Sequence, residues 1–366
     1  MNQRRMGFLF VAALLVIGVA VWLSLAKRPQ SNETLAGKPV LEGLKPVLNE
    51  VTEIRISKGD ATRATLHKRD ADWSVIEREY PADSGKVRKL LLDLGALEVV
   101  EEKTSDPASY ARIGVEDVKS PQAGGTLVEV VTPKKVFGLI VGRTGDGRSA
   151  YVRVNGAKAS ALASPQVTPE ADPKRWLDHA LVDIPESRVK EVAVRPASGP
   201  AYSISRDKKE QNDFTVSNVP KGRELTSPGV GNAAAGDLTS FQLDDVRHAP
   251  ADAKAAASAT FRTFDGLEVK VDGFLDGDRH LVALTPSSTA KETEAEAQSL
   301  SARAKGWQFE VPAYKYDAMF RPLEQLLKQP EPKPEKKADP KAPAKKTGQK
   351  PAQKPTATPA EPASSN

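Results

Sequence analysis

One stretch of the chain decides its fold, namely DADWSVIEREYPADSGKVRKLLLDL (residues 70–94). In its first part Trp73 and Val75 alternate with polar residues, which is typical of a strand with one buried face. We expect Pro81 to end this strand, because proline cannot donate a hydrogen bond to the neighbouring strand. The first part therefore predicts a strand that stops before the helical pattern begins.

The second part of the stretch predicts an amphipathic helix that starts after Asp83 or Ser84, whose side chains can accept hydrogen bonds from the first turn. Apolar residues then recur at helical spacing and share one face: Val87, Leu90, Leu91, Leu94 and Leu97. Burying each such side chain contributes about 1.5–3 kcal/mol before entropy is subtracted. The stretch therefore folds to make a core, which Trp73 is expected to cover.

The surrounding sequence predicts further strands joined by tight turns. A hairpin is expected around Lys58-Gly59-Asp60, and three more strands at residues 127–131, 136–141 and 151–154. The Gly145-Asp146-Gly147 segment can reach the positive φ of a hairpin turn. Since consecutive strands lack long crossovers, we predict antiparallel pairing and an α+β fold.

The pattern occurs a second time, 131 to 144 residues later. VTEIRI (51–56) recurs as VKEVAV (189–194), and the Arg69-Asp70 and Trp73 positions recur as Arg206-Asp207 and Phe214. Asp93-Leu94 recurs as Asp237-Leu238, and the Gly142 loop as the Gly273 loop. The second copy is degenerate, because Phe214 replaces tryptophan and the Gly/Ala-rich segment 228–236 stands where the helix should begin.

These repeats predict two tandem, duplicated α+β modules, residues 49–165 and 181–327, joined by a linker at 166–180. Large apolar side chains of both copies are the candidate structural core residues. They are Trp73, Val87, Leu90, Leu91, Leu94, Trp176, Phe214 and Trp307.

The N-terminus carries an uncharged run of twenty residues, 7–26, which is long enough to cross a bilayer as one helix. We predict a signal anchor, with 1–6 as a cytoplasmic N-terminus and 27–48 as a linker. A cleaved signal peptide is the alternative, since Ser24-Leu25-Ala26 resembles a cleavage site, but the run exceeds a usual signal core and Trp22 suits a membrane interface.

Membrane orientation follows less directly from charge. Four basic residues follow the span and only Arg4, Arg5 and the α-amine precede it, which by count favours a cytoplasmic body. A short basic N-terminus usually stays inside, however, and long domains translocate regardless of their charge. We therefore expect the body to be periplasmic or otherwise outside the cytoplasm. The absence of cysteine fits either compartment.

The net charge of +5 resides in the C-terminal tail, where residues 328–366 hold nine lysines and four acidic residues. This tail also holds nine of the 28 prolines and no large apolar side chain, so we predict that it is disordered. It could be a solvated extension, a spacer or a weak ligand of anionic polymers. Aromatic residues are 5% of the chain and no basic excess remains elsewhere, so nucleic acid is not expected as a partner.

Catalytic groups are hard to assign from the sequence. The four histidines, His67, His179, His248 and His280, form no HExxH motif or close pair, so we expect structural or exposed roles for them. The loop 142–147 lacks the order of a phosphate-binding motif and is interpreted as a hairpin turn. We therefore predict no catalytic residue, no metal site and no cofactor.

Two further acidic segments suggest chemistry but have simpler explanations. Asp276-Gly277-Asp278 is too short for a calcium loop and is interpreted as a turn. The adjacent Glu101 and Glu102, with Asp106, are interpreted as a solvated edge, because neighbouring acids on a strand point to different sides.

Several segments together resemble the DUF4340 family of bacterial proteins, over roughly residues 45–327. The segments are the apolar N-terminal run, Trp73, Tyr80-Pro81-Ala82-Asp83, Tyr110-x-x-Ile113-Gly114, Tyr151-Val152-Arg153 and Trp176-Leu-Asp-His-Ala-Leu-Val-Asp-Ile184. The resemblance implies a membrane-anchored protein of unknown function, with some members associated with ABC-type transport or gliding-motility complexes. It implies no catalytic residues.

Two functional hypotheses follow. The first is a non-enzymatic, membrane-anchored module outside the cytoplasm that acts as a scaffold or accessory subunit of an envelope transport or assembly complex. The second is a membrane-tethered hydrolase or polymer-binding enzyme with its site between the modules, formed by Arg69, Asp72, Arg206 and Asp213. If these residues only close turns, each Arg-Asp pair contributes no more than about 1 kcal/mol.

Overall fold

The computed structural model describes residues 36–329. The predicted membrane span at 7–26 and almost all of the predicted disordered tail lie outside these residues. Between residues 36 and 329, no helix is long and apolar enough to cross a membrane.

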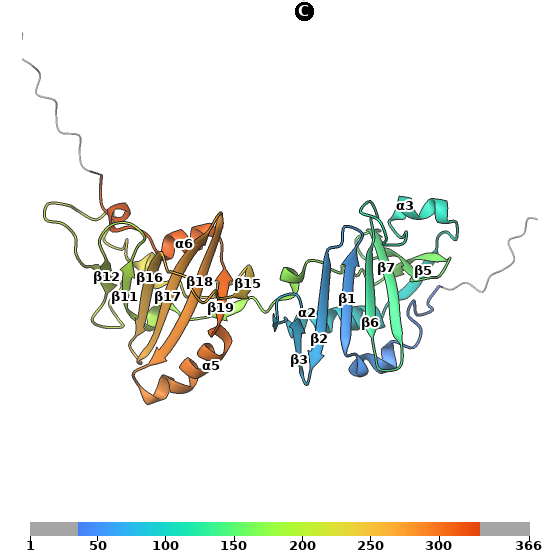
Figure 1. The fold of residues 1–366 in the computed structure, drawn as a ribbon, viewed down its shortest axis with the longest axis horizontal. Helices are drawn as coiled ribbons and strands as arrows, with labels where there is room; N and C mark the ends of the chain where they lie inside the picture. The colour runs from blue at the N-terminus through green and yellow to red at the C-terminus, as the bar shows by residue number, and fades with distance from the viewer. Residues whose placement is uncertain (1–35, 330–366) are drawn as a thin grey trace, which may run out of the picture. The chain divides into compact units, whose positions relative to one another are not determined.

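The first half of the chain forms a nine-stranded antiparallel sheet in the order β4-β3-β2-β1-β6-β7-β8-β9-β5 (Figure 1). Its strands are β1 (Glu53–Lys58), β2 (Arg63–Arg69), β3 (Asp72–Val75), β4 (Tyr80–Pro81), β5 (Glu98–Glu102), β6 (Thr126–Val131), β7 (Val136–Thr144), β8 (Ala150–Val154) and β9 (Ser160–Ser164).

The second half forms an eight-stranded antiparallel sheet in the order β13-β12-β11-β16-β17-β18-β19-β15. Its strands are β11 (Val189–Arg195), β12 (Tyr202–Ser205), β13 (Thr215–Val216), β15 (Asp245–His248), β16 (Ala257–Thr263), β17 (Leu267–Asp276), β18 (Arg279–Ser288) and β19 (Trp307–Glu310). A separate two-stranded sheet pairs β10 (Ala180–Val182) with β14 (Phe241–Gln242).

The two large sheets share one topology. In each, the first hairpin lies toward one edge. The first strand of the same sheet after the helix, β5 after residues 84–95 and β15 after residues 232–235, forms the opposite edge. The described residues therefore form mainly antiparallel sheets with some helices, which agrees with the predicted α+β fold. The described residues up to Lys328 belong to one compact unit.

The helices are short apart from two. The α-helices are α2 (Ser84–Gly95), α3 (Tyr110–Ile113), α4 (Asn232–Ala235), α5 (Glu294–Ala304) and α6 (Ala313–Met319). The 3-10 turns are η1 (Lys45–Glu50), η2 (Pro107–Ser109), η3 (Pro173–Trp176), η4 (Glu186–Arg188), η5 (Lys291–Thr293) and η6 (Leu323–Leu326).

Helix α2 forms because the residue before it caps its first turn and because its apolar residues recur at helical spacing. The Asp83 carboxylate accepts hydrogen bonds from the backbone N–H groups of Gly85 and Lys86, which the first helical turn leaves unpaired. The buried residues of the helix are Val87, Leu90, Leu91 and Leu94. Its counterpart α4 has only four residues, because Gly231 and Gly236 flank it and glycine disfavours a helix.

Two predictions about the first half of the chain were wrong in detail, one about strand β3 and one about the segment 27–48. Strand β3 ends at Val75, and Pro81 does not end it but lies in β4, an edge strand that pairs with β3. The segment 27–48 is not a linker throughout, because the Val40 N–H donates to the Leu97 carbonyl at 2.9 Å and Leu44 is fully buried.

The structure buries seven of the eight candidate core residues, namely Trp73, Val87, Leu90, Leu91, Leu94, Trp176 and Phe214. Trp307 is partly exposed and packs against the same hydrophobic cluster. This cluster is continuous across both large sheets.

Candidate functional site

The segment predicted as a linker, 166–180, is built into the edge of the first sheet. The Asp83 N–H donates to the Trp176 carbonyl at 2.8 Å, and the Asp178 N–H donates to the Pro81 carbonyl at 2.9 Å. The Trp176 side chain is buried, and its Nε1–H donates to the Glu170 carbonyl at 2.7 Å. The connection between the halves is therefore an ordered extension of β4.

The same segment continues into the second half. The Leu243 N–H donates to the His179 carbonyl at 3.0 Å, and His179 Nδ1 lies 2.6 Å from the Leu243 carbonyl oxygen. Strand β10 then pairs with β14 at Ala180 and Gln242. Residues 176–182 therefore bond through their backbone to both halves, and we call the region around them the junction.

A partly buried ion pair crosses the junction. Arg78, in the turn between β3 and β4, donates from Nε to Asp245 Oδ1 at 2.6 Å and from Nη2 to Oδ2 at 3.1 Å. The Asp245 side chain on β15 is 5% exposed, and Lys174 Nζ lies 3.5 Å from its Oδ2. Burial alone would raise the pKa of Asp245, but the hydrogen bonds from Arg78 and the Val246 N–H outweigh it and hold that pKa below its usual value. The two halves are thus joined by a bidentate charge pair.

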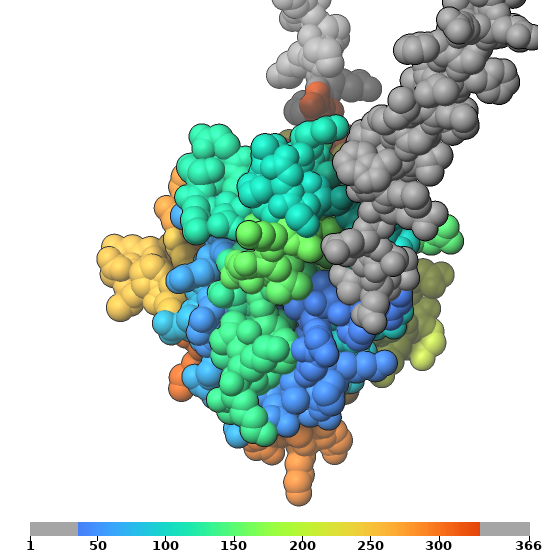
Figure 2. Space-filling model, turned by 90° about the vertical axis from the view of Figure 1, so that its right-hand side faces the viewer, coloured from blue at the N-terminus to red at the C-terminus, as the bar shows by residue number. Residues whose placement is uncertain are grey.

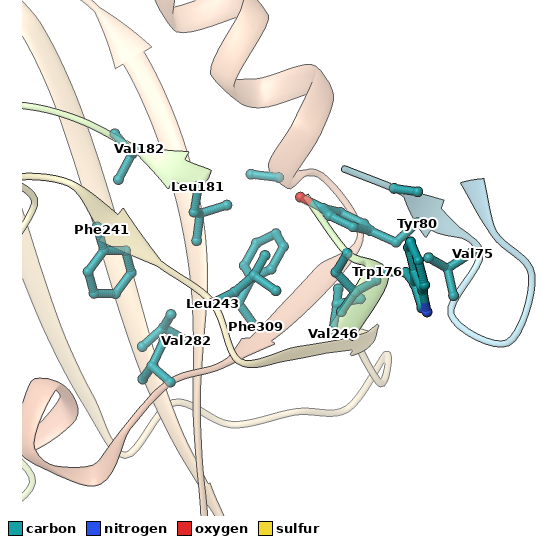
Figure 3. Packing of buried hydrophobic residues seen from close by; sticks show 14 of the residues in the cluster. Val75, Tyr80, Trp176, Leu181, Val182, Phe241, Leu243, Val246, Val282 and Phe309 are labelled. Carbon is teal, nitrogen blue, oxygen red and sulfur yellow. The ribbon is translucent and has the colours of Figure 1, made fainter. Parts of the chain in front are cut away.

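Aromatic side chains fill the space beside this ion pair. The buried Tyr80 ring meets Trp307 edge to face at 5.4 Å and Phe309 at 6.0 Å between ring centroids. His248 stacks on Trp307 at 4.1 Å, and its Nε2 lies 3.0 Å from Glu79 Oε2. Figure 3 shows Tyr80 reaching from the first sheet toward Phe309 of the second. The junction is therefore filled with packed side chains.

The residues of the hydrolase hypothesis do not gather at the junction. Arg69 and Asp72 are exposed and lie opposite each other in the β2–β3 hairpin. Arg206 is buried, and it donates to the backbone carbonyls of Val189, Gln211 and Glu186. Asp213 accepts a hydrogen bond from Asn232 Nδ2 at 2.9 Å. The structure therefore does not bring these four residues together at the junction.

A second buried arginine occupies the first half. Arg153 donates from Nε to the Val115 carbonyl at 2.7 Å, from Nη1 to the Ala157 carbonyl at 2.9 Å and from Nη2 to Asp117 at 2.6 Å. Its guanidinium lies over the Tyr110 ring at 4.7 Å. The hydrogen bond from Arg153 lowers the pKa of Asp117. Two segments of the family resemblance, at Tyr110 and at Arg153, therefore meet in one structural cluster.

A cavity of about 570 Å³ lies beside this cluster and is a candidate site for a ligand. Its walls come from β8, the β8–β9 loop, β9, β5 and the segment 38–42, and we call it the β8–β9 cavity. Most of the lining side chains are valine or alanine. Its volume falls within the roughly 300–1,000 Å³ of typical ligand pockets.

A second cavity, of about 390 Å³, lies in the second half beside α6 and is lined by Tyr316, His280 and Phe320 among others. The Tyr316 hydroxyl is buried without a hydrogen-bond partner. In the same half, Asp237 is 8% exposed, its Oδ2 has no hydrogen-bond partner, and burial raises its pKa to about 7. In the sequence Asp237 stands out only as part of the repeated Asp-Leu pair, because nothing in the neighbouring residues indicates that its side chain is buried.

The structure places the four histidines and the two glycine-containing turns as follows. His67 lies on β2, His179 and His248 lie at the junction, and His280 packs edge-on against Tyr316 at 5.1 Å. Gly147 and Gly277 adopt positive φ at the turns before β8 and β18. In the part of the chain that the structure describes, no cluster of three or more His, Cys, Asp or Glu side chains could hold a metal ion.

The described part of the chain thus has an α+β fold with two large sheets of the same topology. The junction joins these two sheets. Residues 73–275 match the family described as "Domain of unknown function (DUF4340)", and this range is more than half of the 366-residue chain. The chain therefore belongs to the DUF4340 family. The match is narrower than the 45–327 that the resemblance suggested, but it includes both sides of the junction. No curated protein matches the chain, and no solved structure matches it.

Proposed function

We propose that this protein is a membrane-anchored, non-catalytic module that holds partner proteins of an envelope transport or assembly complex outside the cytoplasm. The junction carries the proposal. A bidentate Arg78–Asp245 pair, packed aromatic rings and a backbone segment shared by both halves occupy the place where a two-domain enzyme usually keeps a cleft.

Anchoring is supported by the sequence, because residues 7–26 are long and apolar enough for one membrane helix. The resemblance to DUF4340 proteins implies ABC-type transporters or gliding-type complexes as the partners. A body with two joined sheets would present a fixed surface to such a partner.

The test uses the full-length protein in its own cells. A reporter that is active only outside the cytoplasm, fused after residue 330, is expected to be active. Affinity purification from solubilised membranes is expected to recover transporter or envelope components. The double variant Arg78→Ala/Tyr80→Ala should reduce that recovery at least tenfold at equal membrane abundance, because the halves lose their fixed arrangement.

Arg69→Ala is the matched control, because Arg69 is an exposed arginine in the same half. It should leave the recovered partners unchanged. An inactive reporter would contradict the proposed orientation. Equal recovery with the junction variant would contradict the role of the junction.

A further inference from the structure

The β8–β9 cavity has apolar walls and a charged opening. Val152 is buried, Val154 and Ala161 are half-buried, and all three line it. Of the four charged lining residues, Lys38, Glu42 and Glu102 are exposed and lie at the opening. The fourth, Arg153, is buried in the wall, and its guanidinium donates to protein oxygens. A ligand with an apolar chain and a headgroup of both charges would match this distribution.

The cavity rim is held in place by the buried Arg153. Its Nη1 donates to the Ala157 carbonyl in the β8–β9 loop, and its Nε donates to the Val115 carbonyl outside the sheet. On the other side, Ser160 Oγ donates to the Thr104 carbonyl at 2.7 Å, which fixes the start of β9 to the segment after β5. The opening is therefore preformed, which limits the entropy lost when a ligand binds.

The remaining wall is the first described segment of the chain. The Gly37 N–H donates to the Val99 carbonyl at 2.7 Å, and the Val99 N–H donates to the Lys38 carbonyl at 3.0 Å. Figure 2 looks onto this end of the first half, where the blue surface from the start of the described chain lies beside a green surface from later in that half. The cavity wall is thus continuous with the chain that leads to the predicted membrane span.

This continuity limits how far the cavity can lie from a membrane. Residue 36 lies ten positions after Ala26, the end of the predicted span. At roughly 3.3–3.6 Å for each residue, a fully extended tether reaches at most about 36 Å. If 7–26 spans the bilayer, the cavity therefore stays within reach of the lipid surface.

We propose that the β8–β9 cavity binds one acyl chain of a zwitterionic phospholipid taken from the adjacent membrane. The inference rests on the proposed membrane anchoring. The proposal adds a lipid-binding site to a protein whose proposed function is otherwise to bind partner proteins.

The test reconstitutes the full-length protein into phosphatidylethanolamine vesicles that contain a trace of the same lipid with a diazirine on its acyl chain. After irradiation, labelled peptides are identified by mass spectrometry. We expect labels on β8, β9 and residues 38–42. Ala161→Phe, which fills the cavity, should reduce this labelling at least tenfold.

Ala197→Phe is the matched control, because Ala197 lines the other cavity, in the second half. It should leave labelling unchanged. If Ala161→Phe unfolds the protein, Ala159→Trp at the exposed rim replaces it. Labels outside the cavity only, or labelling unaffected by the filling variant, would overturn the inference. So would displacement by free palmitate but not by unlabelled phospholipid.

Vesicle flotation separates the two proposals. A protein that does not float with the vesicles contradicts both the anchoring and the acyl site. A protein that floats but carries no label in the cavity contradicts the acyl site alone.

Discussion

Two buried arginines, Arg153 and Arg206, each organise one half of the protein. Each guanidinium lies over an aromatic ring and donates to backbone carbonyls from separate segments. Such carbonyls would be unpaired if the arginine were removed, and a buried unpaired acceptor is costly.

This predicts a sharp contrast between the two Arg positions of the repeat. Arg206→Ala should lower the free energy of unfolding by about 2–4 kcal/mol, since three carbonyls lose a charged donor. Arg69→Ala should change it by no more than about 0.5 kcal/mol, because Arg69 is exposed. Urea unfolding of the two variants measures both values, and equal effects would contradict the distinct roles.

The carboxyl group of Asp237 makes stability depend on pH. Lys315 and Arg321 favour its charged form, but burial outweighs them and raises its pKa to about 7. Between about pH 4 and pH 7 the folded state keeps a proton that the unfolded state has released. This group's contribution to stability is therefore present at low pH and is lost as the pH rises through 7.

Asp237→Asn should remove this pH dependence. At pH 8 the variant should be more stable than the unaltered protein, by at most about 4 kcal/mol for a shift from 3.8 to about 7. Thermal unfolding at pH 5 and pH 8 measures the difference. Asp317→Asn is the control on the neighbouring helix α6, and an equal gain there would contradict the assignment.

At the scale of elements, helix α2 was predictable because its signals are local. The Asp83 cap and the stripe from Val87 to Leu94 can be read directly from the sequence. The edge strand β4 was not, because it has only two residues, which pair with β3 across the short turn 76–79, and its other edge bonds to residues near 177, almost a hundred positions away. The end of β3 was placed wrongly because this short turn has no glycine or proline to mark it.

The helix offers a matched pair of leucines. Leu94→Ala should lower the free energy of unfolding by about 2–5 kcal/mol, because Leu94 is 1% exposed and a cavity would remain. Leu92 is 56% exposed, so Leu92→Ala should cost less than about 0.5 kcal/mol. Denaturant unfolding decides this, and similar losses would contradict the assigned buried face.

At the scale of the whole molecule, the repeat was visible in the sequence but the junction was not. The recurring VTEIRI and VKEVAV segments contribute to β1 and β11. These two strands occupy equivalent positions, β1 between β2 and β6 and β11 between β12 and β16. The contacts of Arg78 with Asp245 and of Tyr80 with Trp307 join residues more than 160 positions apart. No local spacing predicts such pairs. The resemblance segment Tyr151-Val152-Arg153 contributes Val152 and Arg153 to the β8–β9 cavity, but nothing in its sequence indicates a cavity.

The junction ion pair predicts strong coupling. Arg78→Met should lower the free energy of unfolding by about 3 kcal/mol, because it leaves the buried Asp245 carboxylate with the more distant Lys174, 3.5 Å away, as its charged partner. The double variant Arg78→Met/Asp245→Leu should regain most of that loss. Lys89→Ala, which removes an exposed pair with Asp93, should cost less than about 1 kcal/mol. A double-mutant cycle by urea unfolding measures the coupling, and additive effects would contradict it.

The most direct test of the account measures distances between the two sheets in the full-length protein. The chain has no cysteine, so cysteines introduced at the exposed Lys134 and Lys208 would be the only sites for spin labels. We predict one narrow distance distribution by double electron–electron resonance, and broadening after Arg78→Ala/Tyr80→Ala. A broad or multiple distribution in the otherwise unaltered protein would contradict the claim that the junction fixes the two halves into one scaffold.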